Sequence, residues 1–477
     1  MNMMKTITPL WTAEDAETAT GGATNFEWAA SGVSINTRTL KPGDLFVALQ
    51  GPNVDGHDYV ADAVEKGAVA ACVAHRPPVL DSDTPNLVVD DTMCALESLA
   101  IAARARTTAK VIAVTGSVGK TGVKDALKLV LSAQGETSAS EGSLNNHWGL
   151  PLSLARVPAG ADFAILEMGM NHPGELTPLS KMARPHVCLI TTVQAAHTEF
   201  FDSTEQIADA KAEIFQGAEP GWTAVLNADI AEFDRLSAAA LTAGAGSVIT
   251  FGESIDADFR VIAYKLSPQG SVVTAVTPVG RVDYSIVSPG RHWVVNSLSV
   301  LAAVHAAGGD VARAAETLAE LSPPKGRGAR FEIAIKGGTF TLIDESYNAS
   351  PAATRAALAV LAAQPVANGA RRIAVLGDML ELGEDTPQLH AELADVIVEH
   401  PIDSVFVAGE AVAHLWNALP QHLHGHRSAT ADLLAEVVKS AVRPGDVVMV
   451  KGSAGARMGH VVATLMAMDV KRQKEEA

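Results

Sequence analysis

The amino-acid sequence predicts an α/β protein of three domains, and three observations lead to this prediction. A chain of 477 residues is too long for a single hydrophobic core, and its length corresponds to about three domains of ordinary size. Short apolar runs, typical of buried strands, alternate with helical stretches along most of the chain. A proline- and glycine-rich stretch, Ser322–Gly328, interrupts the alternation and indicates a boundary. We therefore expect domains over residues 1–108, 109–325 and 326–477.

The composition limits the possible functions. Hydrophobic residues make up 48% and charged residues 19% of the chain, as in globular enzymes. The net charge of −18 argues against general affinity for nucleic acid, because phosphate backbones attract clustered lysine and arginine. The three cysteines fit neither a disulfide framework nor a zinc motif and indicate a reducing compartment. The N-terminus has no apolar signal segment, and no apolar run is long enough to span a membrane, so we expect a cytoplasmic protein without membrane insertion.

The first segment predicts a small α/β domain. Asp44–Leu49 follows a Pro-Gly turn and has the pattern of a strand. Tyr59–Gly67 is expected to form a short helix and Val69–Val73 another strand. Ala95–Arg106 is expected to form a helix that leads out of this domain.

The second segment predicts a parallel sheet. Its buried runs are Val111–Val114, Phe163–Leu166 and Val187–Ile190, each separated from the next by helical stretches. Continuous apolar strands that alternate with helices are typical of a parallel sheet covered on both faces.

The third segment predicts a Rossmann-like C-terminal domain. Two strands, Phe331–Ile335 and Phe340–Ile343, follow the linker. Alternation of strands and helices then resumes, with apolar runs at Ile373–Leu376, Ser404–Ala408 and Val447–Val450. This pattern indicates a second, smaller doubly wound sheet.

A glycine-rich turn follows the first buried run of the central segment and opens a helix near Gly122. It reads Thr115, Gly116, Ser117, Val118, Gly119, Lys120, Thr121. Glycines allow backbone amides to approach phosphate oxygens, and the helix N-terminus favours the same anion. Lys120 would pair with the β- and γ-phosphates, and the Thr121 hydroxyl would bind Mg²⁺. Val114 stands where the common P-loop has its first glycine, so an ordinary glycine turn is the alternative. The sequence thus predicts a P-loop ATPase-like central domain.

Polar side chains follow the next two buried runs. Glu167 ends one strand, and His197 follows the other, so both are expected at the same edge of the sheet. A carboxylate there suits Mg²⁺, which prefers oxygen ligands. Either residue alone is more often a satisfied strand-end group, but the phosphate loop favours the functional interpretation. Lys211 lies on a helix that enters from Thr204, and by itself it reads as a solvated lysine.

These residues together resemble the Mur ligase family, which shares its central domain with folylpolyglutamate synthases. The short glycine loop is similar to the ATP loop of that family, and Glu167, His197 and Lys211 match its magnesium-site carboxylate, histidine and lysine. The lysine is carbamylated in many members, so the resemblance implies that Lys211 acts as an extra carboxylate near a second Mg²⁺. It implies ATP and two Mg²⁺ ions, with Lys120, Glu167, His197 and Lys211 as the catalytic set.

The resemblance extends to residues that would contact ATP. His292 and Asn296, in Gly290–Asn296, are similar to the adenine-side motif of the family, although Trp293 stands where asparagine is common. Arg330 matches an arginine that reaches ATP from the third domain, and Asp344 is assigned to the same ligand. The implied ATP-binding set is Thr115, Gly116, Ser117, Val118, Gly119, Lys120, Thr121, His292, Asn296, Arg330 and Asp344.

The resemblance also concerns the other two domains. Asn36–Arg38, Pro42–Gly51 and Asp55–His57 are similar to the UDP-sugar-binding domain, with Asn36 in place of a usual aspartate. Asp344–Pro351 resembles the motif of the branch that adds D-alanyl-D-alanine. The implied substrates are UDP-N-acetylmuramoyl-tripeptide and D-alanyl-D-alanine. The implied substrate-binding residues are Thr37, Arg38, Asn145, Asn146, Tyr347 and Asn348.

The implied reaction is ATP-dependent amide formation through an acyl phosphate, and two other functions stay open. A folylpolyglutamate-type ligase would share the central domain but lack the domain with Asp55–His57. A P-loop nucleotide-binding module without ligase chemistry would need neither Lys211 nor Asp344–Pro351. Two bland alternatives also remain for single sites: Lys211 as an unmodified lysine, and Tyr347 with Asn348 as a capped turn before the helix at Pro351.

Overall fold

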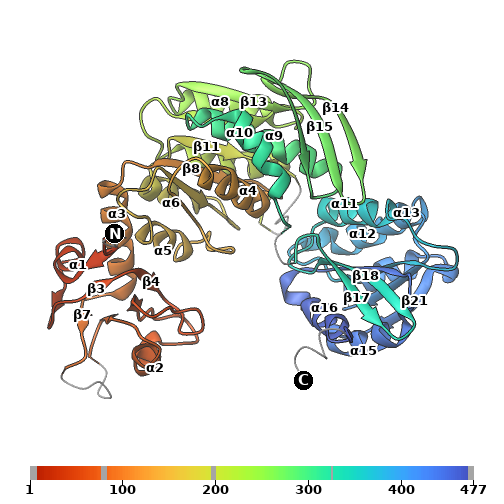
Figure 1. Ribbon diagram of the computed structural model, residues 1–477, viewed down its shortest axis with the longest axis horizontal. Coiled ribbons are helices and arrows are strands. Elements are labelled where there is room, and N and C mark those ends of the chain that lie inside the picture. Colours follow the sequence, from red (N-terminus) through yellow and green to blue (C-terminus); the bar gives the residue numbers. More distant parts are fainter. Residues whose placement is uncertain (1–7, 77–82, 195–199, 324–325, 471–477) are drawn as a thin grey trace, which may run out of the picture.

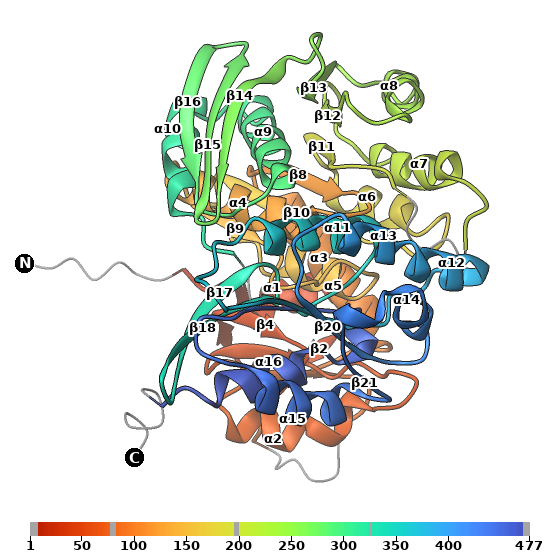
Figure 2. The ribbon, with the colours of Figure 1, turned by 90° about the vertical axis from the view of Figure 1, so that its right-hand side faces the viewer.

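The computed structural model describes residues 8–76, 83–194, 200–323 and 326–470. Figure 1 shows three α/β bodies, with the central one on top and the N-terminal and C-terminal ones below it on separate sides, and in Figure 2 the two lower bodies lie one behind the other. The main sheets have five, nine and six strands. This architecture confirms the predicted fold class. No helix in the described part of the chain is long and apolar enough to cross a membrane.

The N-terminal domain contains the five-stranded sheet. Its strands, in spatial order, are β2 (Ala23–Thr24), β7 (Asn86–Val88), β6 (Ala70–Val73), β5 (Asp44–Val47) and β4 (Gly32–Ser34). Only the β2–β7 pair is antiparallel. A small pair, β1 (Trp11–Thr12) and β3 (Ala29–Ala30), lies beside α1 (Ala13–Thr20), and α2 (Val60–Glu65) follows a 3₁₀ turn.

Helix α3 (Thr92–Arg106) leads from this domain into the central one and packs against α5 (Gly149–Ala155). Two hydrogen bonds fix the junction. The Trp11 indole donates to the Ala155 carbonyl at 2.9 Å, and the Arg156 Nε donates to the Val33 carbonyl at 2.7 Å. The first two domains are therefore joined by packing as well as by the chain.

The central domain contains the nine-stranded sheet. Its strands, in spatial order, are β16 (Gly280–Ile286), β15 (Gly270–Thr277), β14 (Phe259–Ser267), β13 (Ser247–Gly252), β12 (Thr223–Asn227), β11 (Val187–Ile190), β8 (Lys110–Thr115), β10 (Phe163–Glu167) and β9 (Thr137–Ala139). The strands from β9 to β14 pair in parallel. The prediction of a parallel sheet is incomplete, because β14, β15 and β16 extend it as an antiparallel meander.

Successive residues of β8 enter two different cores. Val111 and Ala113 pack on one face with α5, α6 (Leu176–Ala183), α7 (Thr204–Ala212) and α8 (Phe233–Thr242). Ile112 and Val114 pack on the other with α4 (Lys120–Ser132), α9 (Arg291–Ala306) and α10 (Val311–Thr317). A strand buried on both faces has to be apolar throughout, which explains the continuous run in the sequence.

The C-terminal domain contains the six-stranded sheet. Its strands, in spatial order, are β17 (Ala329–Ile335), β18 (Gly338–Glu345), β22 (Val447–Lys451), β19 (Arg372–Gly377), β20 (Ser404–Ala408) and β21 (His424–Ser428). Only the β17–β18 pair is antiparallel. The helices are α11 (Pro351–Ala362), α12 (Thr386–Ala391), α13 (Leu393–Val398), α14 (Ala413–Ala418), α15 (Ala431–Ala441) and α16 (Gly459–Met466). They cover both faces, with α11 and α13 on one and α15 and α16 on the other.

Candidate active site

The glycine-rich loop lies between the end of β8 and the start of α4, at the carboxyl edge of the central sheet. Gly116 and Gly119 have φ angles of 146° and 90°, which side chains rarely adopt. A Cβ at Gly116 would collide with Thr191 Oγ1, and one at Gly119 would lie 3.2 Å from the Asn296 amide. Glycine is therefore required at both positions by conformation and by close approach.

The loop is fastened to the segment that follows β11. Thr191 Oγ1 donates to the Val118 carbonyl at 2.6 Å, and the Ser117 amide donates to the Thr192 carbonyl at 2.9 Å. Ser117 Oγ also donates to the Gln194 carbonyl at 3.1 Å. The loop is thus held in one shape by the protein itself, which is the preorganisation that phosphate binding needs.

The first residue of α4, Lys120, folds back over this loop. Its Nζ donates to the Gly116 carbonyl at 2.6 Å. Burial lowers the pKa of Lys120, the negative charge of Glu167 opposes that shift, and the positive charge of Arg327 adds to it. The ammonium group therefore lies where a phosphate would replace a carbonyl as its partner.

Glu167 is the buried carboxylate beside the loop. It ends β10 and is 1% exposed. Its Oε1 accepts hydrogen bonds from Thr121 Oγ1 at 3.1 Å and from Asn145 Nδ2 at 2.8 Å. Its Oε2 is buried and has no hydrogen-bond partner. A buried carboxylate oxygen without a partner is costly unless a ligand completes the site.

These residues fit Mg²⁺. The free oxygen of Glu167 and the Thr121 hydroxyl are hard oxygen ligands beside the phosphate loop. No group of three His, Cys, Asp or Glu side chains converges anywhere in the part of the chain that is described. Magnesium commonly binds with one or two protein ligands and takes the others from phosphates and water, so this small ligand set suits it.

Lys211 lies at the end of α7 and is 2% exposed. Burial, and then the positive charge of Lys120, lower the pKa of Lys211 well below its usual value. The interpretation of Lys211 as a solvated helix lysine is therefore wrong. No ion pair joins Lys211 to a carboxylate within the described ranges. His197, predicted to lie at the same edge, falls outside the described residues.

Helix α9 packs against the loop and against α4. The Asn296 side chain lies beside Gly119 of the loop. A Cβ on Gly122 would lie 2.8 Å from the Trp293 ring, so the indole fills the space between the two helices. Trp293, which stands where the common motif has asparagine, thus packs between the two helices.

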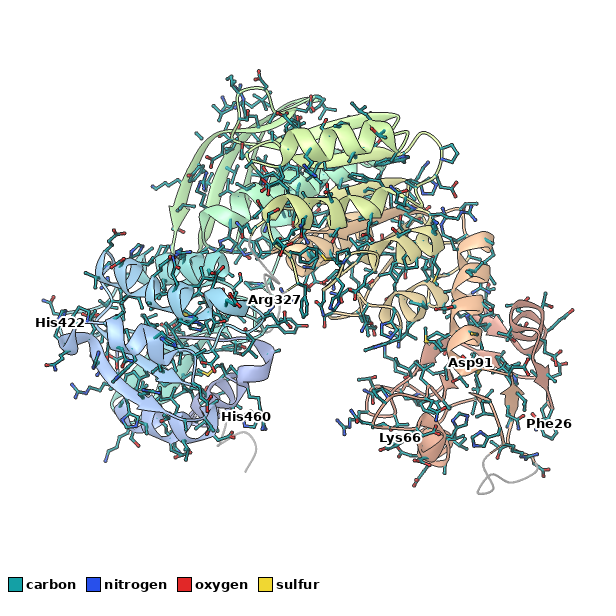
Figure 3. The ribbon with its side chains drawn as sticks, turned by 180° about the vertical axis from the view of Figure 1, so that it is seen from behind. Phe26, Lys66, Asp91, Arg327, His422 and His460 are labelled. Carbon is teal, nitrogen blue, oxygen red and sulfur yellow. The ribbon has the colours of Figure 1, made fainter. Side chains whose placement is uncertain are left out.

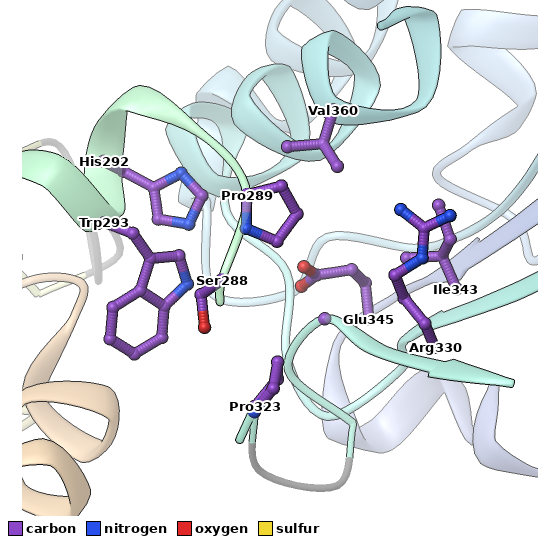
Figure 4. Close-up of a pocket in the computed structure, with 10 residues that line it drawn as sticks. Ser288, Pro289, His292, Trp293, Pro323, Arg330, Ile343, Glu345 and Val360 are labelled. Carbon is purple, nitrogen blue, oxygen red and sulfur yellow. The ribbon is translucent and has the colours of Figure 1, made fainter. Parts of the chain in front are cut away.

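A small pocket lies between α9 and the C-terminal domain, and Figure 4 shows its walls. His292 and Trp293 come from the central domain, whereas Arg330, Glu345 and Val360 come from the third domain. Arg330 donates to the Gln364 side chain at 2.6 Å and also to the carbonyl of Pro268, in the turn between β14 and β15. The predicted ATP contacts His292 and Arg330 therefore meet at the boundary of two domains.

Asp344 is 1% exposed, and its two carboxylate oxygens bind the linker and the turn after β18. Oδ2 accepts from the Gly326 amide at 3.0 Å, and Oδ1 accepts from the Ser346 amide at 3.1 Å and hydroxyl at 2.6 Å. Asp344 therefore fixes the backbone of the linker where the chain enters the third domain.

The remaining predicted substrate residues lie on three elements. Thr37 is buried and Arg38 exposed in the N-terminal domain. Asn145 bonds to Glu167, and Asn146 accepts from the Gly149 amide at 2.9 Å at the start of α5. Tyr347 and Asn348 are exposed after β18.

The sequence interpretation assigned no site role to a charged pair and an arginine near Tyr347. Lys451 is 3% exposed. Its Nζ donates to the Asn348 carbonyl at 3.0 Å and lies 3.5 Å from Glu345 Oε2. Arg327 stacks over the Tyr347 ring at 4.1 Å. Two features of the sequence could have pointed to them. Glu345 directly follows Asp344, and Arg327 lies between the two glycines of the linker.

The fold and the loop together define a three-domain nucleotide-binding protein of the P-loop class. Family models match along the chain: the Mur ligase family catalytic domain at residues 29–104, the Mur ligase middle domain at 114–304, and the Mur ligase glutamate ligase domain at 329–454. The chain belongs to the Mur ligase family, which uses ATP.

Several relatives carry the same name, UDP-N-acetylmuramoyl-tripeptide--D-alanyl-D-alanine ligase. The one from Escherichia coli is 35% identical over 91% of this chain and 93% of its own length. The one from Rickettsia prowazekii is 32% identical over 95% of this chain and 99% of its own length.

Solved structures agree. MurF from Acinetobacter baumannii has a TM-score of 0.80 and 29% identity, over 96% of this chain and 99% of that one. MurF ligase from Thermotoga maritima, in complex with ADP, has a TM-score of 0.75 and 26% identity, over 92% and 98%. The similarity therefore covers all three domains.

The buried carboxylate gives a prediction. Glu167→Gln keeps the side-chain volume and the bonds from Thr121 and Asn145, but it removes the negative charge and the free oxygen. We expect ATP-dependent turnover to fall by about 100-fold or more, because the site loses its anionic oxygen ligand. The melting temperature should stay close to that of the unaltered protein. Glu136→Gln, at an exposed position of the same domain, is the control. Normal turnover in a folded Glu167→Gln protein would remove Glu167 from the site.

Proposed function

We propose that this protein joins D-alanyl-D-alanine to UDP-N-acetylmuramoyl-tripeptide, forming UDP-N-acetylmuramoyl-pentapeptide, ADP and phosphate in peptidoglycan synthesis. The observation that carries the proposal is full-length similarity to relatives named for this reaction, across all three domains. A protein similar only in its ATP-binding domain would match in the central segment alone. The motif Asp344–Pro351 supports the same branch of the family.

The first step activates a carboxylate, because amide formation from a free carboxylate is unfavourable. The loop amides and Lys120 hold the β- and γ-phosphates of ATP, and the α4 N-terminus adds a favourable dipole. An oxygen of the tripeptide carboxylate attacks the γ-phosphorus, so the bond to ADP breaks and an acyl phosphate forms. Bound Mg²⁺ supplies charge neutralisation on the transferring phosphoryl group.

The proposed ligands for two Mg²⁺ ions are Thr121, Glu167, His197 and the carbamate of Lys211. The free Glu167 oxygen and the buried amine of Lys211 support this assignment. A lowered pKa increases the fraction of the neutral amine, which is the form that reacts with CO₂. The carbamate would turn a buried base into an oxygen ligand.

The second step forms the amide. The free amine of D-alanyl-D-alanine attacks the acyl carbon, phosphate leaves with the electrons of the broken bond, and the amine loses a proton. Water would hydrolyse the same intermediate, so the domains have to close around it. The N-terminal and C-terminal domains lie on separate sides of the central domain, which allows the two substrates to approach from different directions (Figure 1).

Each domain has a proposed role within the boundaries expected from the sequence. Residues 1–108 bind the UDP-muramoyl peptide through Thr37 and Arg38, and residues 109–325 bind ATP, with Asn145 and Asn146 near the tripeptide. Residues 326–477 close on ATP and bind the dipeptide through Tyr347 and Asn348. We also propose a cytoplasmic location, which the three unpaired cysteines support.

The product assay tests this function. The protein, ATP and Mg²⁺ are incubated with D-alanyl-D-alanine and with UDP-muramoyl tripeptides that end in lysine or in diaminopimelate. We expect mass spectrometry to detect the pentapeptide product from at least one tripeptide, with one ADP formed for each product molecule. ATP hydrolysis without product, or product from L-alanyl-L-alanine at an equal rate, would contradict the proposal.

The Lys211 carbamate gives a further prediction. Lys211→Ala should lose about 100-fold or more in kcat, and short-chain carboxylates such as acetate should restore part of it by supplying the missing oxygens. Lys128→Ala, which removes an exposed lysine of α4, is the matched control and should keep full activity without any effect of acetate. Full activity of Lys211→Ala, or a loss that no carboxylate restores in a folded protein, would indicate an ordinary buried lysine.

A further inference from the structure

The turn that joins the second and third domains holds an arginine between two glycines. Gly326 and Gly328 have φ angles of 76° and 93°. The Gly326 amide donates to Asp344 Oδ2 at 3.0 Å, and the Gly328 amide donates to the Asp344 carbonyl at 2.8 Å. The Tyr347 amide donates to the Gly326 carbonyl at 3.1 Å. The backbone on both sides of Arg327 is therefore fixed to β18 and to the loop after it.

The side chain of Arg327 is fixed as well. Its guanidinium lies over the Tyr347 ring, 4.1 Å from the centroid, in a cation–π stack. Figure 3 shows Arg327 at the side of the third domain that faces the other two. The charge of Arg327 contributes to the lowered pKa of Lys120, behind the larger effect of burial. Arg327 therefore acts electrostatically on the phosphate loop from the third domain.

No carboxylate in the described residues forms a salt bridge with Arg327. The oxygens of Asp344 are occupied by Gly326 and Ser346. Glu345 pairs with Lys451 at 3.5 Å, and its pKa, which burial raises, is lowered more by the charge of Lys451 than by that of Arg327. Two other half-buried or buried arginines are paired: Arg104 with Glu219 at 3.1 Å, and Arg371 with Asp446 at 2.6 Å. A guanidinium that is held by its stack on Tyr347 and forms no salt bridge within the described residues is suited to bind an anionic ligand.

We propose that Arg327 binds the C-terminal carboxylate of the dipeptide substrate, an inference that rests on the proposed function. A planar guanidinium forms two parallel hydrogen bonds to a carboxylate, and among the described residues no hydrogen-bond partner occupies the edge of Arg327. Tyr347 belongs to the loop of the third domain, on which the dipeptide site is expected. An extended dipeptide spans about 7 Å, so a carboxylate held at Arg327 allows the amine to point toward the phosphate loop.

A carboxylate fits this position better than a phosphate of ATP. The phosphates already have Lys120, the loop amides and the N-terminus of α4 as partners. Arg327 is instead anchored to β18 and Tyr347, in the third domain. Its role is therefore specificity for a dipeptide with a free C-terminus.

The test compares two acceptors, D-alanyl-D-alanine and its C-terminal amide, which lacks the negative charge. The kcat/KM for each is measured with the unaltered full-length protein and with Arg327→Met and Arg327→Lys. We expect the unaltered protein to prefer the free carboxylate by about 10- to 100-fold. Arg327→Met should lose most of that preference through a higher KM for the dipeptide, with little change for the amide. Arg327→Lys should keep part of the preference, because lysine keeps the positive charge but lacks the planar guanidinium that forms two parallel hydrogen bonds.

Arg281→Met is the matched control, since Arg281 is an exposed arginine of β16 that pairs with Asp283. It should keep the full preference. An equal loss for both acceptors in Arg327→Met, or a raised KM for ATP with the preference unchanged, would overturn the inference while the proposed function stands. Failure of the unaltered protein to use either acceptor would overturn the proposed function, and this inference with it.

Discussion

The fastening of the glycine loop to the end of β11 is the constraint on which the site depends. Thr191 occupies the space that a side chain at position 116 would need, and its hydroxyl holds the Val118 carbonyl. The loop therefore has one available path from β8 into α4. That path fixes the amides, Lys120 and Thr121 in place, as their proposed binding of a nucleotide requires. Because Glu167 ends the neighbouring strand, the same register brings its carboxylate to Thr121.

Two residues with predicted ATP contacts, Asp344 and Arg330, are held by other groups of the protein. Asp344 binds the linker and Ser346, and Arg330 binds Pro268 and Gln364. These groups would have to change partners to reach a nucleotide. The chemistry gives a reason for such a change, since an acyl phosphate survives only where water is excluded. The arrangement in Figure 1 is therefore suited to substrate entry, and domain closure would complete the site.

The sequence predicted best those features that depend on neighbouring residues. The buried strand Val111–Val114 is apolar because both of its faces are covered, and the glycines that follow it require positive φ angles. The antiparallel meander was missed because β14 exposes most residues after Val261, which hides the apolar pattern of a buried strand. Arg327, Glu345 and Lys451 were assigned no site role for another reason: their environment is created by contacts between segments far apart in the chain. The hydrogen bonds of Asp344 to the linker were equally invisible in the sequence.

The central claim is that the phosphate loop transfers the γ-phosphoryl group of ATP to the carboxylate of the tripeptide. The most direct measurement uses a UDP-muramoyl tripeptide whose reacting carboxylate is labelled with ¹⁸O. If an acyl phosphate forms and the dipeptide amine displaces its phosphate, each molecule of inorganic phosphate released carries one ¹⁸O atom from the carboxylate. Phosphate released without the label, at the same rate as product forms, would contradict the account.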